Sequence, residues 1–315
     1  MNHSIRYAPP GEFLAEITQR CLLGFFLLKP SKRLNDLVAG VVAKAQQKYP
    51  VKVVGLSVPS NHYHLLATAT SQQDLSEFMN FVASNVAREA GREYGWKGRF
   101  WSGRYDCTPI TEEETIQVAR LKYILSQGCK EGLVASPRSW PGINCAKALM
   151  TGTSLQGVWI DRTALYNARR RKGPKAVRPI DFHEKICLEF VPLPCWAHLA
   201  PEEYQARVRN LVEQIEEETA AMHRLQGTRP LGRRAVLRQD PLHRPRYLKT
   251  APSPRVHAAT AAARKKFLEA YRIFVTAFRA ASARFRNGEF DVKFPEGSFP
   301  PARRFIRAAQ HPGTG

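Results

Sequence analysis

Two histidines separated by one residue, His62 and His64, constrain the fold of this chain more than any other feature. They lie between two mostly apolar segments, residues 51–58 and 65–69, which predict one long strand or two strands joined at a kink. Side chains two residues apart on a strand point to the same face, so His62 and His64 are expected side by side, with Tyr63 in the opposite layer. Two neutral imidazoles presented together form half of a metal site, although a histidine on a sheet face is more often an ordinary polar residue.

The net charge of +21 over 315 residues indicates a polyanionic partner, nucleic acid first and an anionic membrane surface second. The charge is uneven: residues 1–150 contain 18 Lys and Arg against 12 Asp and Glu (+6), and residues 151–315 contain 30 against 15 (+15). A chain of this length allows two domains, or one domain with a large extension. We therefore expect a domain over residues 1–150 and a more basic extension over residues 151–315.

The six cysteines are scattered and form no C-x-x-C pair, which argues against a zinc ribbon or a disulfide framework. This usage is typical of reduced thiols in a cytoplasmic protein. The longest apolar run near the start, residues 21–28, is too short to span a bilayer, and the first residues lack the apolar core of a signal peptide. The sequence therefore predicts a soluble cytoplasmic protein that does not bind a membrane.

Strand and helix patterns alternate through the first half of the chain. The expected elements are strand, turn and strand at 13–28, a helix at 31–48, the histidine-bearing strand or strands at 52–69, a helix at 71–94, a strand or loop near 96–105, and a helix at 111–127. The last helix should begin at Thr111, because Glu114 three residues later completes a capping box. This order favours an α+β domain with a mostly antiparallel sheet covered by helices.

The pattern changes after residue 150, where we expect a largely helical extension. The expected elements are a short helix at 159–171, a strand at 182–190, and helices at 201–222 and 261–286. Residues 227–257 are rich in Pro and Arg and are expected to be extended or irregular. The aromatic stripe of the last helix is expected to serve as core or as a docking face.

The helix at 111–127 strengthens the hypothesis that the histidine pair belongs to a metal site. Tyr123 and Gln127 are four residues apart and so share one helix face. A tyrosine there is most often plain core, but a buried glutamine needs a polar partner. His62, His64 and Gln127 together could supply two nitrogens and one oxygen to a divalent metal ion, with Tyr123 beside the ion.

At this point the sequence resembles a known family, the HUH single-tyrosine transposases of bacterial insertion sequences and their relatives, the REP-associated tyrosine transposases. The segment His62-Tyr63-His64 is similar to the His-hydrophobic-His motif, with Pro59 and Asn61 in the usual run-in. Residues 98–106, 121–127 and 132–137 resemble the tryptophan-containing segment, the nucleophile helix and the Gly-Leu-Val segment of the family. The resemblance covers roughly residues 8–145, in the family's order and spacing.

The resemblance implies a ferredoxin-like antiparallel sheet covered by helices, the HUH nuclease domain, over residues 1–150. It implies that Tyr123 is the nucleophile and that His62, His64 and Gln127 hold Mg²⁺ or Mn²⁺. The implied activity is a transposase that cleaves and rejoins single-stranded DNA with hairpins or palindromic repeats, through a 5′-phosphotyrosine. Such a protein would be cytoplasmic and associated with the bacterial nucleoid.

The resemblance leaves open both the branch of the family and the function. Residues 127–130 depart from the Asn-Pro-Val-Arg of the REP-associated branch, while Gln127 resembles the insertion-sequence branch. The branch is therefore undecided, and with it the choice between a monomer and a homodimer. A domesticated nucleic-acid-binding protein without chemistry, or a replication initiator or relaxase-like nickase, would also carry this fold.

Several basic and aromatic residues are expected to contact DNA. The predicted contacts are Arg99, Trp101, Arg104, Lys122, Arg169, Arg170, Arg171 and Lys172. Aromatic side chains stack on bases and cations follow the backbone in single-strand binding sites. The ordinary alternatives are that Trp101 belongs to the core, that Lys122 points about 100° away from Tyr123 on the helix, and that the basic run 169–172 is a solvated face.

Overall fold

The computed structural model describes residues 5–245 and 253–301. Its central sheet contains β1 (Phe13–Arg20), β2 (Val51–Ser57), β3 (His62–Ala69) and β4 (Asp106–Ile110), all antiparallel to their neighbours, in the order β2-β3-β1-β4. Helix α1 (Lys32–Lys48) connects β1 to β2, and α2 (Gln72–Glu93) connects β3 to β4. This order of elements and strands is the ferredoxin-like arrangement, so the predicted α+β fold is confirmed.

Helices α1 and α2 cover one face of the sheet, and their apolar stripes form the larger core with alternate strand residues such as Ile17 and Leu65. Both helices begin where the sequence predicts. The hydroxyls of Ser31 and Ser71 accept hydrogen bonds from the backbone N–H groups three residues later, at 3.0 Å each. These caps satisfy donors that a helix start leaves without an intrahelical partner.

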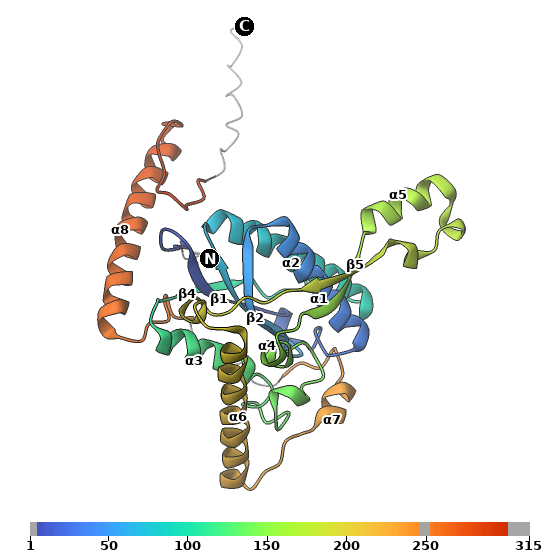
Figure 1. Cartoon of the computed structure of the whole chain (residues 1–315). Coiled ribbons are helices and arrows are strands. Elements are labelled where there is room, and N and C mark those ends of the chain that lie inside the picture. The colour runs from blue at the N-terminus through green and yellow to red at the C-terminus, as the bar shows by residue number, and fades with distance from the viewer. Residues whose placement is uncertain (1–4, 246–252, 302–315) are drawn as a thin grey trace.

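The opposite face is covered by α3 (Glu114–Leu125), α4 (Ala146–Thr151) and α6 (Pro201–Gln226), as Figure 1 shows. Leu14 and Leu66 point into this second core because they alternate with the residues of the first face. Leu121 of α3 and Val212 of α6 meet them there. The sheet is therefore a middle layer, and the histidine-bearing face is the one that carries α3.

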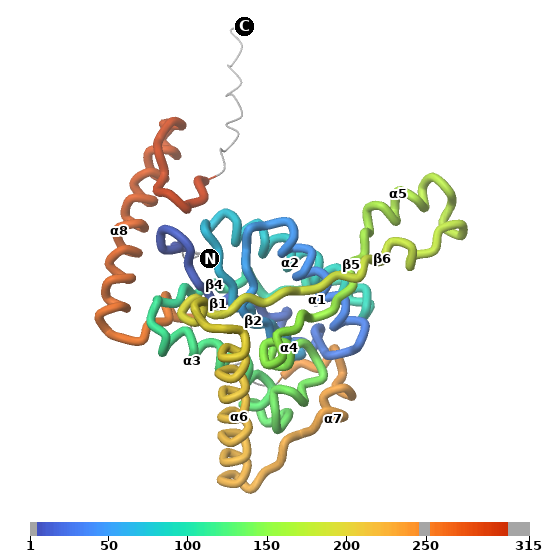
Figure 2. The backbone as a smooth tube through the Cα atoms, viewed as in Figure 1, coloured from blue at the N-terminus to red at the C-terminus, as the bar shows by residue number. Residues whose placement is uncertain are grey.

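A two-stranded ribbon of β5 (Leu155–Ile160) and β6 (His183–Leu188) packs on α1 and carries α5 (Arg162–Lys172) away from the body (Figure 2). The ribbon approaches α1 closely at two glycines. A Cβ added to Gly40 would lie 2.2 Å from the Val158 carbonyl oxygen, and one added to Gly157 would lie 2.3 Å from the Gly40 nitrogen. Neither position can accept a side chain without moving the backbone.

The remaining described elements complete the C-terminal half. These are α7 (Arg233–Arg238), α8 (Ala261–Arg286) and five short 3₁₀ helices at Leu22–Gly24, Pro137–Ser139, Pro174–Ala176, Pro179–Phe182 and Pro194–Trp196. Residues 253–257, here called the strap, run along the outer edge of β4, where Ile110 and His257 form a parallel bridge. Val191 donates its N–H to the Val53 carbonyl at the other edge. The extension predicted after residue 150 thus packs against the central sheet, and independent folding of residues 1–150 stays a prediction.

Three predicted element boundaries in residues 1–150 are wrong. Residues 21–28 form a 3₁₀ turn rather than a second strand, with Leu23 and Gly24 at φ 51° and 73°. Helix α3 begins at Glu114 instead of Thr111, and the predicted capping box does not form. The Thr111 N–H donates to the His257 carbonyl, and the Glu114 carboxylate accepts from Trp196 and Arg207. The helix also ends at Leu125, two residues before the glutamine.

Two boundaries after residue 150 also differ from expectation. Residues 155–160 form a strand and the helix begins only at Arg162, where Asp161 caps it. Helix α7 interrupts the segment 227–257, of which residues 246–252 lie outside the described part of the chain. Within residues 5–245 and 253–301, no helix is both long enough and apolar enough to cross a membrane.

Candidate active site

The pairing of β3 with β1 sets the positions of the two histidines. His64 lies opposite Thr18 and His62 opposite Arg20, at the end of both strands, and both imidazoles face α3. Tyr63 points to the other layer, where its hydroxyl donates to Gln19 Oε1 at 2.8 Å. The alternation of the strand therefore separates the tyrosine between the histidines from the tyrosine of α3.

The two imidazoles meet through their Nε2 atoms, which are 3.1 Å apart. His62 Nδ1 lies 2.6 Å from Asn61 Oδ1, and His64 Nδ1 lies 3.0 Å from Glu16 Oε1. Because a carboxylate and an amide oxygen can only accept, both Nδ1 atoms are assigned as donors. Both Nε2 atoms then carry lone pairs that face the same point, which is the donor set a cation requires.

Burial keeps the two imidazoles neutral. Burial lowers the pKa of His62 well below its ordinary value, and the neighbouring His64, Arg20 and Lys130 lower it further, against the opposing influence of the Gln127 side chain. Burial also lowers the pKa of His64, against the opposing influence of Glu16. A neutral imidazole is the form that ligates metal ions, so no proton has to leave before a cation binds.

Gln127 is the third residue predicted to bind the metal ion. It lies in the turn after α3, close enough to His62 to raise the pKa of that imidazole. Its Nε2 donates to the Tyr123 carbonyl at 3.0 Å, and its Oε1 is buried with no hydrogen-bond partner among the described residues. A buried polar atom without a partner is costly, and a cation at the paired Nε2 atoms would satisfy it. Among the described residues no group of three or more His, Cys, Asp or Glu is arranged to hold a metal ion.

The observed spacing of the histidines fits a metal ion. Two nitrogens at about 2.1 Å from one ion and at about a right angle to each other lie about 3.0 Å apart. The observed Nε2 separation is 3.1 Å. His62, His64 and Gln127 therefore fit a divalent cation as a set of two nitrogens and one oxygen.

Tyr123 lies beside this set on α3 and is half-buried. Its ring meets the His64 ring edge-on, with centroids 5.4 Å apart. Two cations lie against the ring, with Arg120 Cζ at 4.0 Å and Lys130 Nζ at 3.6 Å from its centroid. The phenol is thus surrounded by positive charge, which favours the approach of an anion such as a phosphodiester.

Two further residues, Glu16 and His257, complete the site, and no motif in the sequence pointed to them. Glu16 is only 4% exposed and accepts from His64, from Arg120 Nε at 2.8 Å and from His257 Nε2 at 3.2 Å. Burial alone would raise the pKa of Glu16, but these donors hold it well below its ordinary value. Glu16 thus fixes the orientation of His64, and a lone acidic residue inside the apolar strand 13–20 was the available signal.

The predicted DNA contacts do not all lie at this site. Trp101 is half-buried, donates to the Ala83 carbonyl at 2.9 Å and packs on Tyr63, which favours the core alternative. Lys122 is bound to Gln214 and Glu218 of α6, at 3.0 and 2.7 Å, which favours a structural role.

The arginines predicted to bind DNA are divided between two regions. Arg99 is exposed but donates to the carbonyls of Trp101 and Ser102, and Arg104 lines a pocket beside β4. Arg169, Arg170, Arg171 and Lys172 are exposed at the end of α5, on the part of the chain that extends from the body (Figure 1). DNA binding by these residues stays a prediction.

Comparison with known proteins gives one family match and several similar proteins. Residues 30–127 match a family model described as IS200-like transposase. A segment of 104 residues, 31% of this chain, is 29% identical to the ISDra2 transposase TnpA of Deinococcus radiodurans and covers 70% of that protein.

Two solved structures are also similar. One is a REP-associated tyrosine transposase bound to a REP hairpin, with 16% identity, a TM-score of 0.38, and coverage of 48% of this chain and 86% of that one. The other is a protein of Deinococcus radiodurans described as a transposase, with 19% identity, a TM-score of 0.28, and coverage of 40% of this chain and 98% of that one.

Proposed function

Residues 30–127 match the IS200-like transposase family, and from this premise we propose that the chain cleaves and rejoins single-stranded DNA through Tyr123. The DNA is expected to carry a hairpin or palindromic repeats. The observation that supports this most strongly is that His62 Nε2 and His64 Nε2 meet beside the Tyr123 ring. The Gln127 side chain is close enough to His62 to raise its pKa, and its buried Oε1 has no hydrogen-bond partner among the described residues.

In the proposed reaction the Tyr123 oxygen forms a bond to the phosphorus of a phosphodiester as the bond from phosphorus to the 3′ oxygen breaks. The phenolic proton passes through solvent to the leaving oxygen, so the products are a 5′-phosphotyrosine and a free 3′-OH. No external co-reactant is needed. A 3′-OH from another strand can reverse the step and join new DNA, because one phosphoester replaces another.

The surrounding side chains bind and orient the reacting groups. Arg120 and Lys130, which lie on the Tyr123 ring, would attract the anionic phosphodiester. Glu16 and Asn61 hold the two imidazoles with their Nε2 atoms facing one point. When bound there, Mg²⁺ or Mn²⁺ would polarise the phosphate and stabilise its developing charge.

The nucleophile is tested by trapping the covalent product. Incubation with labelled hairpin DNA and Mn²⁺, followed by a denaturing gel, should give a protein–DNA adduct. Tyr123→Phe should abolish the adduct, while Tyr166→Phe, at an exposed tyrosine of α5, should leave it intact. An adduct that persists in Tyr123→Phe would refute the assignment.

The metal ligands are tested without DNA, by the rise in unfolding temperature that Mn²⁺ causes. A ligand at about 100 times its Kd stabilises the folded state by about 2.7 kcal/mol. Gln127→Met, which keeps the size of the side chain but removes the amide oxygen, and His64→Ala should both reduce this rise. His198→Ala, at an exposed histidine, is the control. An unchanged rise in both site variants would contradict the ligand set.

A nucleic-acid-binding protein that has lost the chemistry, and a replication initiator or relaxase-like nickase, are the alternatives. A protein that only binds DNA has no need of the Nε2 pair, the partnerless amide oxygen and the adjacent phenol. In this chain all of them lie together. The adduct experiment decides between binding and chemistry, because a protein that only binds forms no covalent product.

A further inference from the structure

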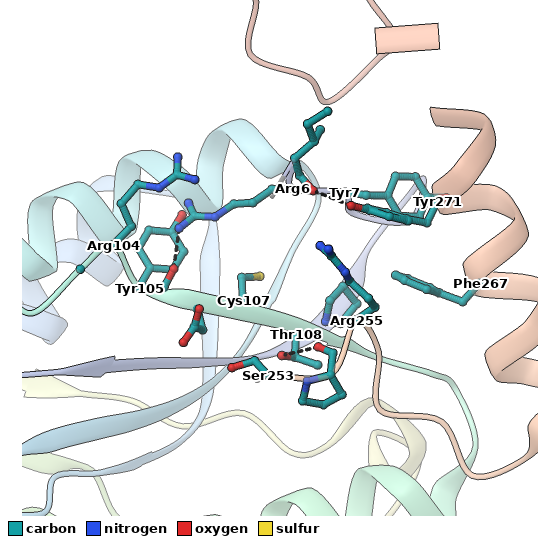
Figure 3. A pocket seen from close by; sticks show the side chains of 15 residues that line it. Arg6, Tyr7, Arg104, Tyr105, Cys107, Thr108, Ser253, Arg255, Phe267 and Tyr271 are labelled. Atoms are coloured by element: carbon teal, nitrogen blue, oxygen red, sulfur yellow. Dashed lines mark hydrogen bonds between the residues drawn. The ribbon is translucent and has the colours of Figure 1, made fainter. Parts of the chain in front are cut away.

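A pocket of about 510 Å³ lies along the outer edge of β4, two strands from the histidine-bearing β3. Its walls come from three parts of the chain that are distant in sequence: the N-terminal residues 5–7, residues 103–109 of β4 and the loop before it, and the strap with α8 (Figure 3). The strap and α8 lie beyond the segment that matches the transposase family, so the match accounts for only part of this pocket.

Three arginines, Arg6, Arg104 and Arg255, line the pocket, against a single carboxylate, that of Asp106. The Arg6 guanidinium is fixed 3.7 Å above the Tyr105 ring and donates to the Tyr105 carbonyl at 2.6 Å. Among the described residues no hydrogen bond or ion pair engages the guanidinium of Arg104 or of Arg255. Two arginines therefore remain available to an anion, and the third is already held in place.

The opposite wall of the pocket is aromatic. Tyr7 packs on Phe267, Tyr271 and Phe274 of α8, with ring centroids 5.4, 6.2 and 5.1 Å away. Arg255 Cζ lies 5.0 Å from the centre of the Tyr271 ring. Cationic side chains beside aromatic rings are the surface that binds single-stranded nucleic acid without sequence preference, because phosphates meet the cations and bases stack on the rings.

The pocket adjoins the candidate active site through the sheet. Asp106, at its margin, pairs with Thr18 of β1, and Thr18 pairs with His64 of β3. With neighbouring strands about 4.8 Å apart, the β4 end of the pocket lies about 10 Å from the histidine strand. The strap also connects the two places, because it carries Arg255 to the pocket and His257 to Glu16.

We propose that this pocket binds the sugar–phosphate backbone of single-stranded DNA, a few nucleotides from the phosphodiester that lies at Tyr123. Arg104 and Arg255 contact phosphates, and Tyr7 and Tyr271 provide the surface for a base or sugar. The proposal rests on the proposed function, since it takes the strand in the pocket to be the strand that is cleaved.

The test is binding of a fluorescein-labelled oligothymidylate to the full chain, followed by anisotropy in EDTA so that no cleavage occurs. The pocket variant is Arg104→Gln with Arg255→Gln. The control is Arg272→Gln with Arg279→Gln, which removes the same charge from exposed positions of α8 outside the pocket. Because the pocket variant can no longer bind two phosphates of a single strand, its slope of log K against log salt should fall by about 1.4, and its affinity at about 0.1 M salt by about 25-fold.

The control should bind like the wild type. Equal losses of affinity in both variants would show a general charge effect and overturn the proposal, as would an unchanged pocket variant or a wild-type protein that does not bind. Thymidine monophosphate that competes as well as the oligonucleotide would show a mononucleotide site and would also overturn it. Failure of the proposed function is distinct, because it would be seen as a missing Tyr123 adduct while the pocket variant still loses affinity.

A second measurement locates the strand. An oligonucleotide containing 5-iododeoxyuridine, irradiated in the complex, should crosslink to the peptide that contains Tyr7 or to the one that contains Tyr271. Crosslinks confined to peptides outside the pocket would overturn the proposal.

Discussion

Replacing Glu16 by glutamine is the change expected to affect both the stability and the active site of this protein. The carboxylate is 4% exposed and accepts from His64, Arg120 and His257. Glutamine keeps the size but removes the charge, and it turns an NH₂ group toward some of these donors. Breaking a buried ion pair from one side costs about 3–5 kcal/mol. Because one amide oxygen can still accept, we expect about 3 kcal/mol.

This loss is measured by urea unfolding at neutral pH, followed by circular dichroism. At about 2 °C per kcal/mol for a chain of this size, the unfolding temperature should fall by about 6 °C. The control is Glu184→Gln, which breaks an ion pair with Lys44 in which the carboxylate side chain is 48% exposed, and which should cost less than about 1 kcal/mol. Equal effects of the two substitutions would refute the interpretation that Glu16 is the centre of a buried network.

The effect of the substitution should also depend on pH. The pKa of Glu16 lies well below its ordinary value of 4.5 in the folded protein. Its contribution to stability is therefore complete above the unfolded-state pKa and is lost as the pH falls below it. The difference in unfolding free energy between the wild type and Glu16→Gln should narrow below about pH 4.5. A difference that widens there would contradict the assigned direction of the pKa shift.

Other predictions concern the packing, the thiols and the extended helix. Gly157→Ala should cost about 1–3 kcal/mol or more, because the new Cβ meets the α1 backbone, whereas Gly103→Ala, with nothing within 4 Å, should be nearly neutral in the same urea titration. Cys187 is exposed and the other five cysteines are not, and burial raises the pKa of each of those five thiols. Ellman's reagent at pH 8 should therefore modify one thiol rapidly, and Cys187→Ser should remove this rapid reaction. Neutralising residues 169–172 with glutamine should lower the salt slope of hairpin-duplex binding by up to about 3.6, and an unchanged slope would exclude this helix from the DNA interface.

The sequence was informative wherever a structure depends on neighbouring residues. Serine caps set the starts of α1 and α2, and the alternation of β3 placed His62 and His64 on one face. The start of α3 could not be predicted in this way, because the Thr111 N–H donates to the distant His257 carbonyl instead of to Glu114. Sequence rules for helix ends consider only hydrogen-bond partners that lie nearby in the chain. They do not include a partner that comes from a distant segment.

The residues of the candidate site also divide into those that the sequence predicts and those that only the structure identifies. The histidines, Gln127 and Tyr123 are found by spacing and by the family resemblance, and the structure brings these four together. Glu16 and His257 have no spacing rule, because their role follows from strand register and from a strap that arrives late in the chain. Only the three-dimensional contacts identify such residues, since nothing near His257 in the sequence indicates its partner.

The strap pairs with β4 only late in synthesis, because it lies far downstream in the chain. The edge of β4 is paired by His257, roughly 150 residues downstream, so a ribosome that adds about 5–20 residues per second leaves this edge open for about 7–30 s. An open edge strand is a template for pairing with other chains. During synthesis the nascent sheet therefore has a period of exposure to misassembly, and Glu16 acquires its donor from His257 only after that period ends.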